Sequence, residues 1–170
     1  SDFLPEWQAF LSIQLALKRL DAAHLPSATD SIWSQYSNWE PLLITQAAVA
    51  LARSDLAGCE SVLSGTQQPP SLEALRVRGA LLLRQRKFQD AIDLLAPAVQ
   101  RFPQHLELQA QYVNSVIEGR SQQLTLPAIR QAMTSHGEHP RLLASVCTVK
   151  LLQRQPSLAR RAALINRLWP

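Results

Sequence analysis

SLEALRVRGALLLRQRKFQDAIDLLAPAVQRFPQ, residues 71–104, is the stretch that decides the fold. The apolar or small residues of its first half lie three and four positions apart: Leu72, Leu75, Gly79 and Leu82. That spacing is typical of one face of a helix. After a polar break, a second run with helical spacing extends from Phe88 to Phe102. The stretch therefore predicts two amphipathic helices joined by a tight turn.

The ends of this helix pair carry recognisable stop and start signals. Pro69 and Pro70 cannot continue a preceding helix, and the hydroxyl of Ser71 can cap the new one. Pro103 ends the second helix, and Pro97 inside it removes one backbone donor and predicts a bend. The small residue Gly79 predicts a close crossing with a neighbouring helix, because short side chains let helix axes approach.

The pair resembles the tetratricopeptide repeat, a unit of two helices in 34 residues. The residues that match the family pattern in register are Gly79, Phe88, Ala91, Ala98 and Pro103. The pair departs from that pattern at Leu75, where the family has Trp, and at Arg78, where it has Leu. The match is therefore specific, and this copy is a divergent one.

Weaker copies of the unit flank it on both sides. A small residue opens each second helix at Ala28, Cys59, Ala91 and Ala128, and a proline follows each at Pro41, Pro70, Pro103 and Pro140. The resemblance implies an all-α, right-handed superhelical solenoid of about five antiparallel helix pairs in one domain. The expected pairs are 3–37, 38–70, 71–103, 104–139 and 140–170. Because Trp169 still has an aromatic ring to bury, we expect this domain to be part of a larger protein.

Composition and charge set further limits. The chain has 170 residues, 46% of them hydrophobic, and a net charge of +4. Residues 141–170 hold six Lys and Arg and no acid, so the positive charge is concentrated there. No run of about 18 apolar residues predicts a membrane span, and no leader of the secretory type opens the sequence. We therefore expect a cytoplasmic protein without a membrane segment.

In the resembled family, the first helix of each pair lines a concave groove where peptides bind. The family's groove positions map here to Ile44, Ala48, Leu51, Arg76, Ala80, Leu83, Ala110, Asn114 and Ile117. This set is more apolar than charged, which favours an apolar or helical segment as the ligand. Only Arg76 and Asn114 resemble the residues with which some members hold a terminal carboxylate. The alternative is that these side chains pack between neighbouring repeats.

Chemistry-bearing motifs are sparse. There is no GxSxG, no glycine-rich phosphate loop, no HExxH and no CxxC. The turn His136-Gly137-Glu138-His139 holds three ligand-type side chains, but a zinc site normally draws on a second cluster, so we interpret it as a polar turn. Cys59 and Cys147 lie in separate segments without metal spacing and are expected in the core. We expect no catalytic residues, no cofactor and no metal.

These observations favour a non-catalytic protein-interaction scaffold, whose partner is another protein or an adjacent domain of the same protein. Two alternatives stay open. The chain is the repeat region of a larger bacterial enzyme of the glycosyl- or sulfotransferase type, which rests on analogy alone. Or it is a nucleic-acid-associated regulator, which its basic C-terminal section suggests and its lack of interleaved aromatic residues disfavours.

Overall fold

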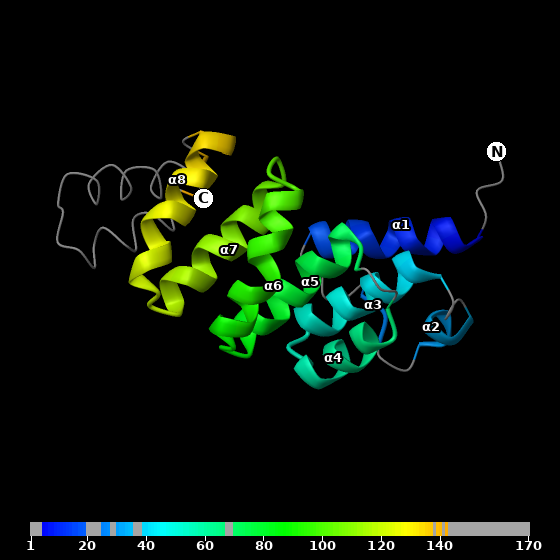
Figure 1. Ribbon diagram of the computed structural model, residues 1–170. Helices are drawn as coiled ribbons and strands as arrows, with labels where there is room; N and C mark the ends of the chain where they lie inside the picture. The colour runs from blue at the N-terminus through cyan, green and yellow to red at the C-terminus, as the bar shows by residue number, and fades with distance from the viewer. Residues whose placement is uncertain are drawn as a thin grey trace. The chain divides into compact units, whose positions relative to one another are not determined.

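The computed structural model describes residues 5–19, 25–27, 30–35, 39–66, 70–137, 139–140 and 142. The helices are α1 (Pro5–Lys18), α2 (Ser31–Gln35), α3 (Glu40–Ala52), α4 (Leu56–Ser64), α5 (Leu72–Arg84), α6 (Phe88–Arg101), α7 (Leu106–Glu118) and α8 (Gln122–His136) (Figure 1). The residues described contain no strand. The prediction of an all-α fold is thereby confirmed.

The chain forms two compact units, Ser1–Gln85 and Arg86–Pro170. In the first unit α3 and α4 pack together, α5 packs on both of them, and α1 and α2 pack on α3. In the second unit α7 packs on α6 and on α8. The order of packing within each unit follows the order of the helices along the chain (Figure 1).

Three of the helices begin at regular intervals and have the same length. Helices α3, α5 and α7 each contain 13 residues. Helix α5 begins 32 residues after α3, and α7 begins 34 residues after α5. The helices that follow them, α4, α6 and α8, begin at the same two intervals. The backbone therefore repeats a unit of helix, three-residue turn and helix.

The turns share an unusual backbone conformation. The middle residue of each is left-handed, with φ of 63° at Ser54, 59° at Arg86 and 54° at Arg120. In the first turn the N–H of Asp55 donates to the carbonyl of Ala50 at 2.9 Å, and in the third the N–H of Ser121 donates to that of Val116 at 3.1 Å. Such bonds close a helix end around a left-handed residue.

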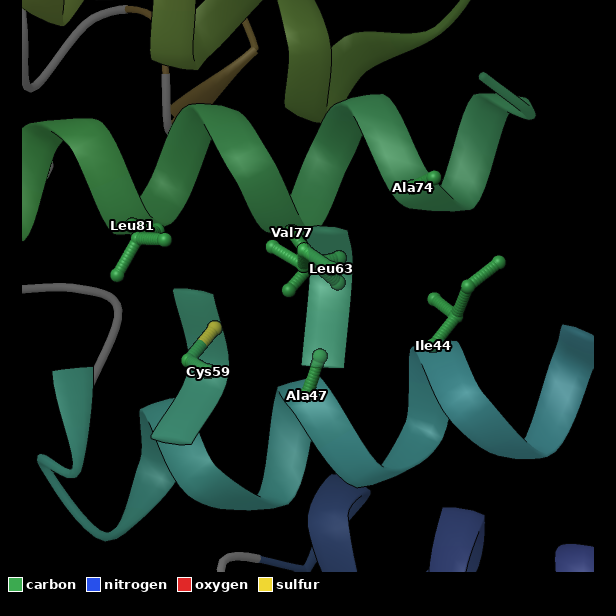
Figure 2. Packing of buried hydrophobic residues seen from close by; sticks show 7 residues of the cluster. All are labelled: Ile44, Ala47, Cys59, Leu63, Ala74, Val77 and Leu81. Atoms are coloured by element: carbon green, nitrogen blue, oxygen red, sulfur yellow. The ribbon is translucent and has the colours of Figure 1, made fainter. Parts of the chain in front are cut away.

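The core of the first unit includes a cluster shared by three helices. Figure 2 shows the side chains of α5 pointing toward α3, with those of α4 between them. The cluster consists of Ile44 and Ala47 of α3, Cys59 and Leu63 of α4, and Ala74, Val77 and Leu81 of α5. The small residues Ala47, Cys59 and Ala74 are fully buried, which lets the three helices approach closely. The prediction that Cys59 lies in the core is confirmed.

A second cluster in the same unit joins α1 and α2 to α3. Its buried members are Ile13, Ala16, Leu25, Trp33, Leu42 and Val49. The ring N–H of Trp33 donates to the carbonyl of Ser27 at 2.7 Å, which satisfies the polar atom of this buried indole. Helix α2 begins at Ser31, and the carboxylate of Asp30 accepts from the N–H of Ile32. The expected cap at Ser27 is therefore wrong, and Asp30 takes that role.

In the second unit, α6 and α7 bury an extended apolar surface. Ala91, Ile92, Leu95, Ala98 and Val99 of α6 are buried, and α6 continues through Pro97, which is exposed. Helix α7 buries residues around most of its circumference: Leu108, Gln109, Ala110, Gln111, Tyr112, Val113, Ser115 and Val116. A helix with so little exposed surface lies between neighbours and does not cover an edge.

The sequence placed the start of α8 three residues too late, because Pro127 reads as a residue of a first helical turn. The structure starts α8 at Gln122 and carries it through Pro127, whose side chain is exposed. The turn before α8 is therefore as short as its counterparts. By the interval of 34, the equivalent of Ala91 is the buried Thr125 and not Ala128, which corrects the repeat register of this copy.

Several predictions fall outside the described residues. They are the small residue Ala28, the position of Cys147, and most of the fifth helix pair at 140–170, including its basic side chains. The groove residues and the other four expected pairs lie on described helices. The superhelical arrangement of the pairs stays a prediction.

Candidate functional site

The candidate binding surface of the first unit lies on the first helices of its pairs, α1, α3 and α5. Helix α3 packs against α1 on one side and against α5 on the other (Figure 1). A hydrogen bond of 2.9 Å from Gln14 Nε2 to Thr45 Oγ1 crosses the contact between α1 and α3. The three helices therefore form a continuous layer in this unit.

On α3 the predicted groove residues differ in burial. Ile44 is buried and belongs to the core cluster shared with α5. Ala48 and Leu51 are half-buried and pack against the same cluster. Pro41 and Ala52, which lie on the same side of the helix as Ala48, are exposed. The surface that α3 offers to a ligand is therefore small and apolar, and Ile44 supports it from below.

On α5 the predicted groove residues Arg76, Ala80 and Leu83 are all half-buried. The guanidinium Nε of Arg76 donates to Glu73 Oε2 at 2.7 Å, an ion pair within one helical turn. A ligand carboxylate would compete with Glu73 for this guanidinium. The ion pair therefore disfavours Arg76 as the anchor of an acidic terminus, and it leaves Ala80 as an apolar contact point beside it.

The predicted groove residues of α7 belong to the second unit. Ala110 is buried, Ile117 is half-buried and Asn114 is exposed. Asn114 lies on the narrow exposed side of α7, together with Glu118. The polar character that the sequence suggested for this position is therefore present at the surface of the second unit.

The residues that carry the family resemblance occupy structural positions. Gly79, Ala91 and Ala98 are buried, and Phe88 is half-buried at the start of α6. Pro103 is exposed in the turn after α6. Small residues at buried positions permit close packing of helices. None of the five is placed to contact a ligand from the open side of a helix, in keeping with a structural role.

Sequence reasoning missed an exposed apolar stripe on α1, defined by Trp7, Leu11 and Leu15. These side chains are 44%, 46% and 52% exposed. They are four residues apart, so they lie along one side of the helix. Leu11 precedes Gln14 by one turn, which places the stripe beside the contact with α3. The signal was present in the sequence as this spacing, but α1 has no partner in the repeat register.

An aromatic cluster closes one end of the α1–α3 contact. The ring of Trp7 lies 5.1 Å from that of Trp39 and 5.8 Å from that of Phe10, both edge-to-face. The rings of Phe10 and Trp39 are 5.4 Å apart. Edge-to-face pairs of this kind stabilise each other beyond the area that they bury. The exposed indole of Trp7 is therefore held in place before any ligand arrives.

The titratable groups do not assemble into a reactive centre. Burial, followed by the nearby charges of Asp55 and Glu60, raises the pKa of the Cys59 thiol to about 11, and a protonated thiol is a poor nucleophile. Within the described ranges no three His, Cys, Asp or Glu side chains come close enough to hold a metal ion. His136 ends α8, and Gly137 supplies a left-handed turn with φ of 61°.

Comparison with protein-family models, with curated proteins and with solved structures found no match. Over the described part of the chain, no helix combines the length and the apolar character that crossing a membrane requires. The interpretation of function therefore rests on the helical repeat and on the surfaces of its first helices.

Proposed function

We propose that this chain is a non-catalytic protein-interaction module of the tetratricopeptide type, which binds a peptide or helical segment across the first helices of its pairs. The observation that carries the proposal is the repeated unit, with three first helices of equal length, each followed by a three-residue turn with a left-handed middle residue. Repeats of this kind stack into extended binding surfaces.

The chemistry of the first helices supports a peptide ligand. The open side of α3 and α5 combines small apolar residues, Ala48 and Ala80, with the ion-paired Arg76. Small side chains leave room for a ligand backbone or an incoming helix to approach closely. An apolar strip with a charged group beside it suits an amphipathic segment, which supplies both kinds of contact.

The test is a selection of displayed random peptides against the 170-residue chain, followed by measured affinities of the enriched peptides. We expect Ala80→Glu, which places a charge on the open side of α5, to weaken binding by about tenfold or more. The matched control is Ala57→Glu, at an exposed position of α4, which should leave the affinity unchanged. If no peptide is enriched, or if the two variants bind as the wild type does, the proposal is wrong.

A further inference from the structure

The search for further sites leads to the stripe on α1, because it is the largest exposed apolar feature of the described residues. The other large exposed side chains, Leu124 and Leu126 of α8, are two residues apart and point to different sides of their helix. The stripe is different, since Trp7, Leu11 and Leu15 are consecutive along one side. Together their exposed parts present about 300 Å² of largely apolar surface, a size that often marks an interaction site.

The charge at one end of the stripe is positive. Lys18 lies one turn beyond Leu15 on the same side of α1, and Arg19 follows it; both are exposed. The distance along the axis is about 12 Å from Trp7 to Leu15, with Lys18 about 4.5 Å farther on. A ligand that covers the stripe therefore meets three apolar positions and then a cationic end.

We propose that the stripe Trp7–Leu11–Leu15 docks an amphipathic helix of another protein, antiparallel to α1, whose acidic first turn lies against Lys18 and Arg19. This inference deepens the proposed function and rests on it. Three anchors four residues apart match the i, i+4, i+7 apolar positions of such a helix. Acidic residues are favoured in the first turn of a helix because they offset its dipole. An antiparallel helix places that turn beside the cations.

The size of the stripe excludes a second copy as its occupant. Two copies pairing through the stripe would bury about 600 Å², while specific dimers bury about 1,200–2,000 Å². The charge argues against a lipid surface as well, because stable electrostatic attachment to anionic membranes takes about four to eight clustered cations. Two cations at one end match an acidic turn of a protein helix better.

The experiment uses two synthetic helical peptides as probes. The acidic probe carries Glu in its first turn followed by Leu at i, i+4 and i+7, and the basic probe has Lys in place of Glu. Binding of each dye-labelled probe to the 170-residue chain is measured by fluorescence anisotropy. We expect saturable binding of the acidic probe, weakened about tenfold or more by Leu11→Glu. Lys18→Glu should weaken the acidic probe and favour the basic one.

The control is Leu126→Glu, since Leu126 is 50% exposed, as Leu15 is 52% exposed, but lies on α8. This variant should bind the acidic probe as the wild type does, and the urea midpoint of each variant shows that its fold is intact. The inference is overturned if the acidic probe shows no saturation up to about 1 mM, if Leu11→Glu and Leu126→Glu behave alike, or if Lys18→Glu does not change the preference between probes.

Two further results would name a different occupant and so overturn the inference. One is dimerisation of the wild type, abolished by Leu11→Glu in sedimentation velocity. The other is binding to phosphatidylglycerol vesicles with no binding to either probe. Failure here is separable from failure of the proposed function: peptides selected from the library that depend on Ala80 but not on Leu11 would remove the docked helix and leave the peptide-binding module.

Discussion

Replacing Gly119 by Ala tests the packing of α6 against α7. Gly119 follows α7 directly, with φ of −72° and ψ of −2°, a conformation that any residue adopts. A Cβ at this position would lie 2.9 Å from the carbonyl oxygen of Ser115, 3.2 Å from Cβ of Phe88 and 3.4 Å from Cδ1 of Ile92. The first distance is shorter than Cβ contacts in proteins. Backbone atoms must therefore move, and the start of α6 must move with them.

Gly65 provides the matched control, because it follows α4 with φ of −84° and ψ of −2°. A Cβ there meets only the carbonyl oxygen of Val62, at an ordinary 3.5 Å. Both substitutions reduce the conformational entropy of the unfolded chain, which stabilises the protein by about 0.4–1 kcal/mol. Only Gly119→Ala also overpacks a helix contact, which costs about 1–3 kcal/mol. The free energies of unfolding of the two variants should therefore differ by about 1–3 kcal/mol.

Urea denaturation followed by circular dichroism measures this difference, with the slope m compared among wild type and both variants. In a thermal scan the same difference corresponds to roughly 2–12 °C. We expect Gly65→Ala to be at least as stable as the wild type and Gly119→Ala to be clearly less stable. If Gly119→Ala is as stable as Gly65→Ala, the close approach of α7 to Phe88 and Ile92 is wrong, and with it the packing of the second unit.

Three further predictions concern the turns and the buried thiol. Ser54→Gly should stabilise the protein by about 0.5–1 kcal/mol in urea denaturation, because Ser54 is left-handed, and the control Ser61→Gly in the interior of α4 should destabilise it. Asp55→Ala should cost about 1 kcal/mol, because the Asp55 carboxylate caps α4 by accepting from the N–H of Gly58 at 2.9 Å; Asp55→Asn keeps an acceptor and should retain most of that stability. Cys59 should resist thiol reagents in native Cys147→Ser protein, because burial, followed by the charges of Asp55 and Glu60, raises its pKa from 9.0 to about 11. The neutral thiol then contributes stability that is fully present below pH 9 and lost as the pH rises toward 11, which the urea midpoint of wild type relative to Cys59→Ala would show.

The sequence predicted the helices most accurately where spacing and capping agreed. The start of α5 after Ser71 is an example: the Ser71 hydroxyl accepts from the N–H of Ala74 at 3.3 Å, as its position after two prolines predicts. The end of α4 before Gly65 was equally legible. These boundaries depend on side chains and backbone within one turn of the chain, which is the range that sequence patterns report.

Boundaries failed where a local signal competed with the rest of the fold. Pro127 is a good first-turn residue, yet α8 begins earlier and places Pro127 on its exposed side. The buried positions Thr125, Ala128, Ile129 and Ala132 explain the choice, since they are spaced as one helical face. Packing that face outweighs the single backbone bond that the proline removes. Only the interval of the repeat, confirmed by the start of α6, could have shown this in advance.

The candidate site was predicted less well than the helices. Family positions identified the open sides of α3 and α5 but also selected Ile44, whose side chain lies in the core. The stripe on α1 was missed because α1 has no copy in the repeat, so no family position pointed to it. Apolar residues on a terminal helix read as core residues in sequence, and only the exposed fractions of Trp7, Leu11 and Leu15 distinguish the two.

The departure of Arg78 from the family pattern has a physical explanation in the first unit. Its Nη2 donates to the carbonyl of Leu63 at 2.8 Å and to Thr66 Oγ1 at 3.1 Å. Both acceptors lie at the end of α4, where helix carbonyls lack partners within the helix. A leucine at this position would offer only apolar contact. The guanidinium instead joins α5 to the end of α4 by directional, charge-assisted bonds, so the divergent residue fixes the angle at which successive first helices present their open sides.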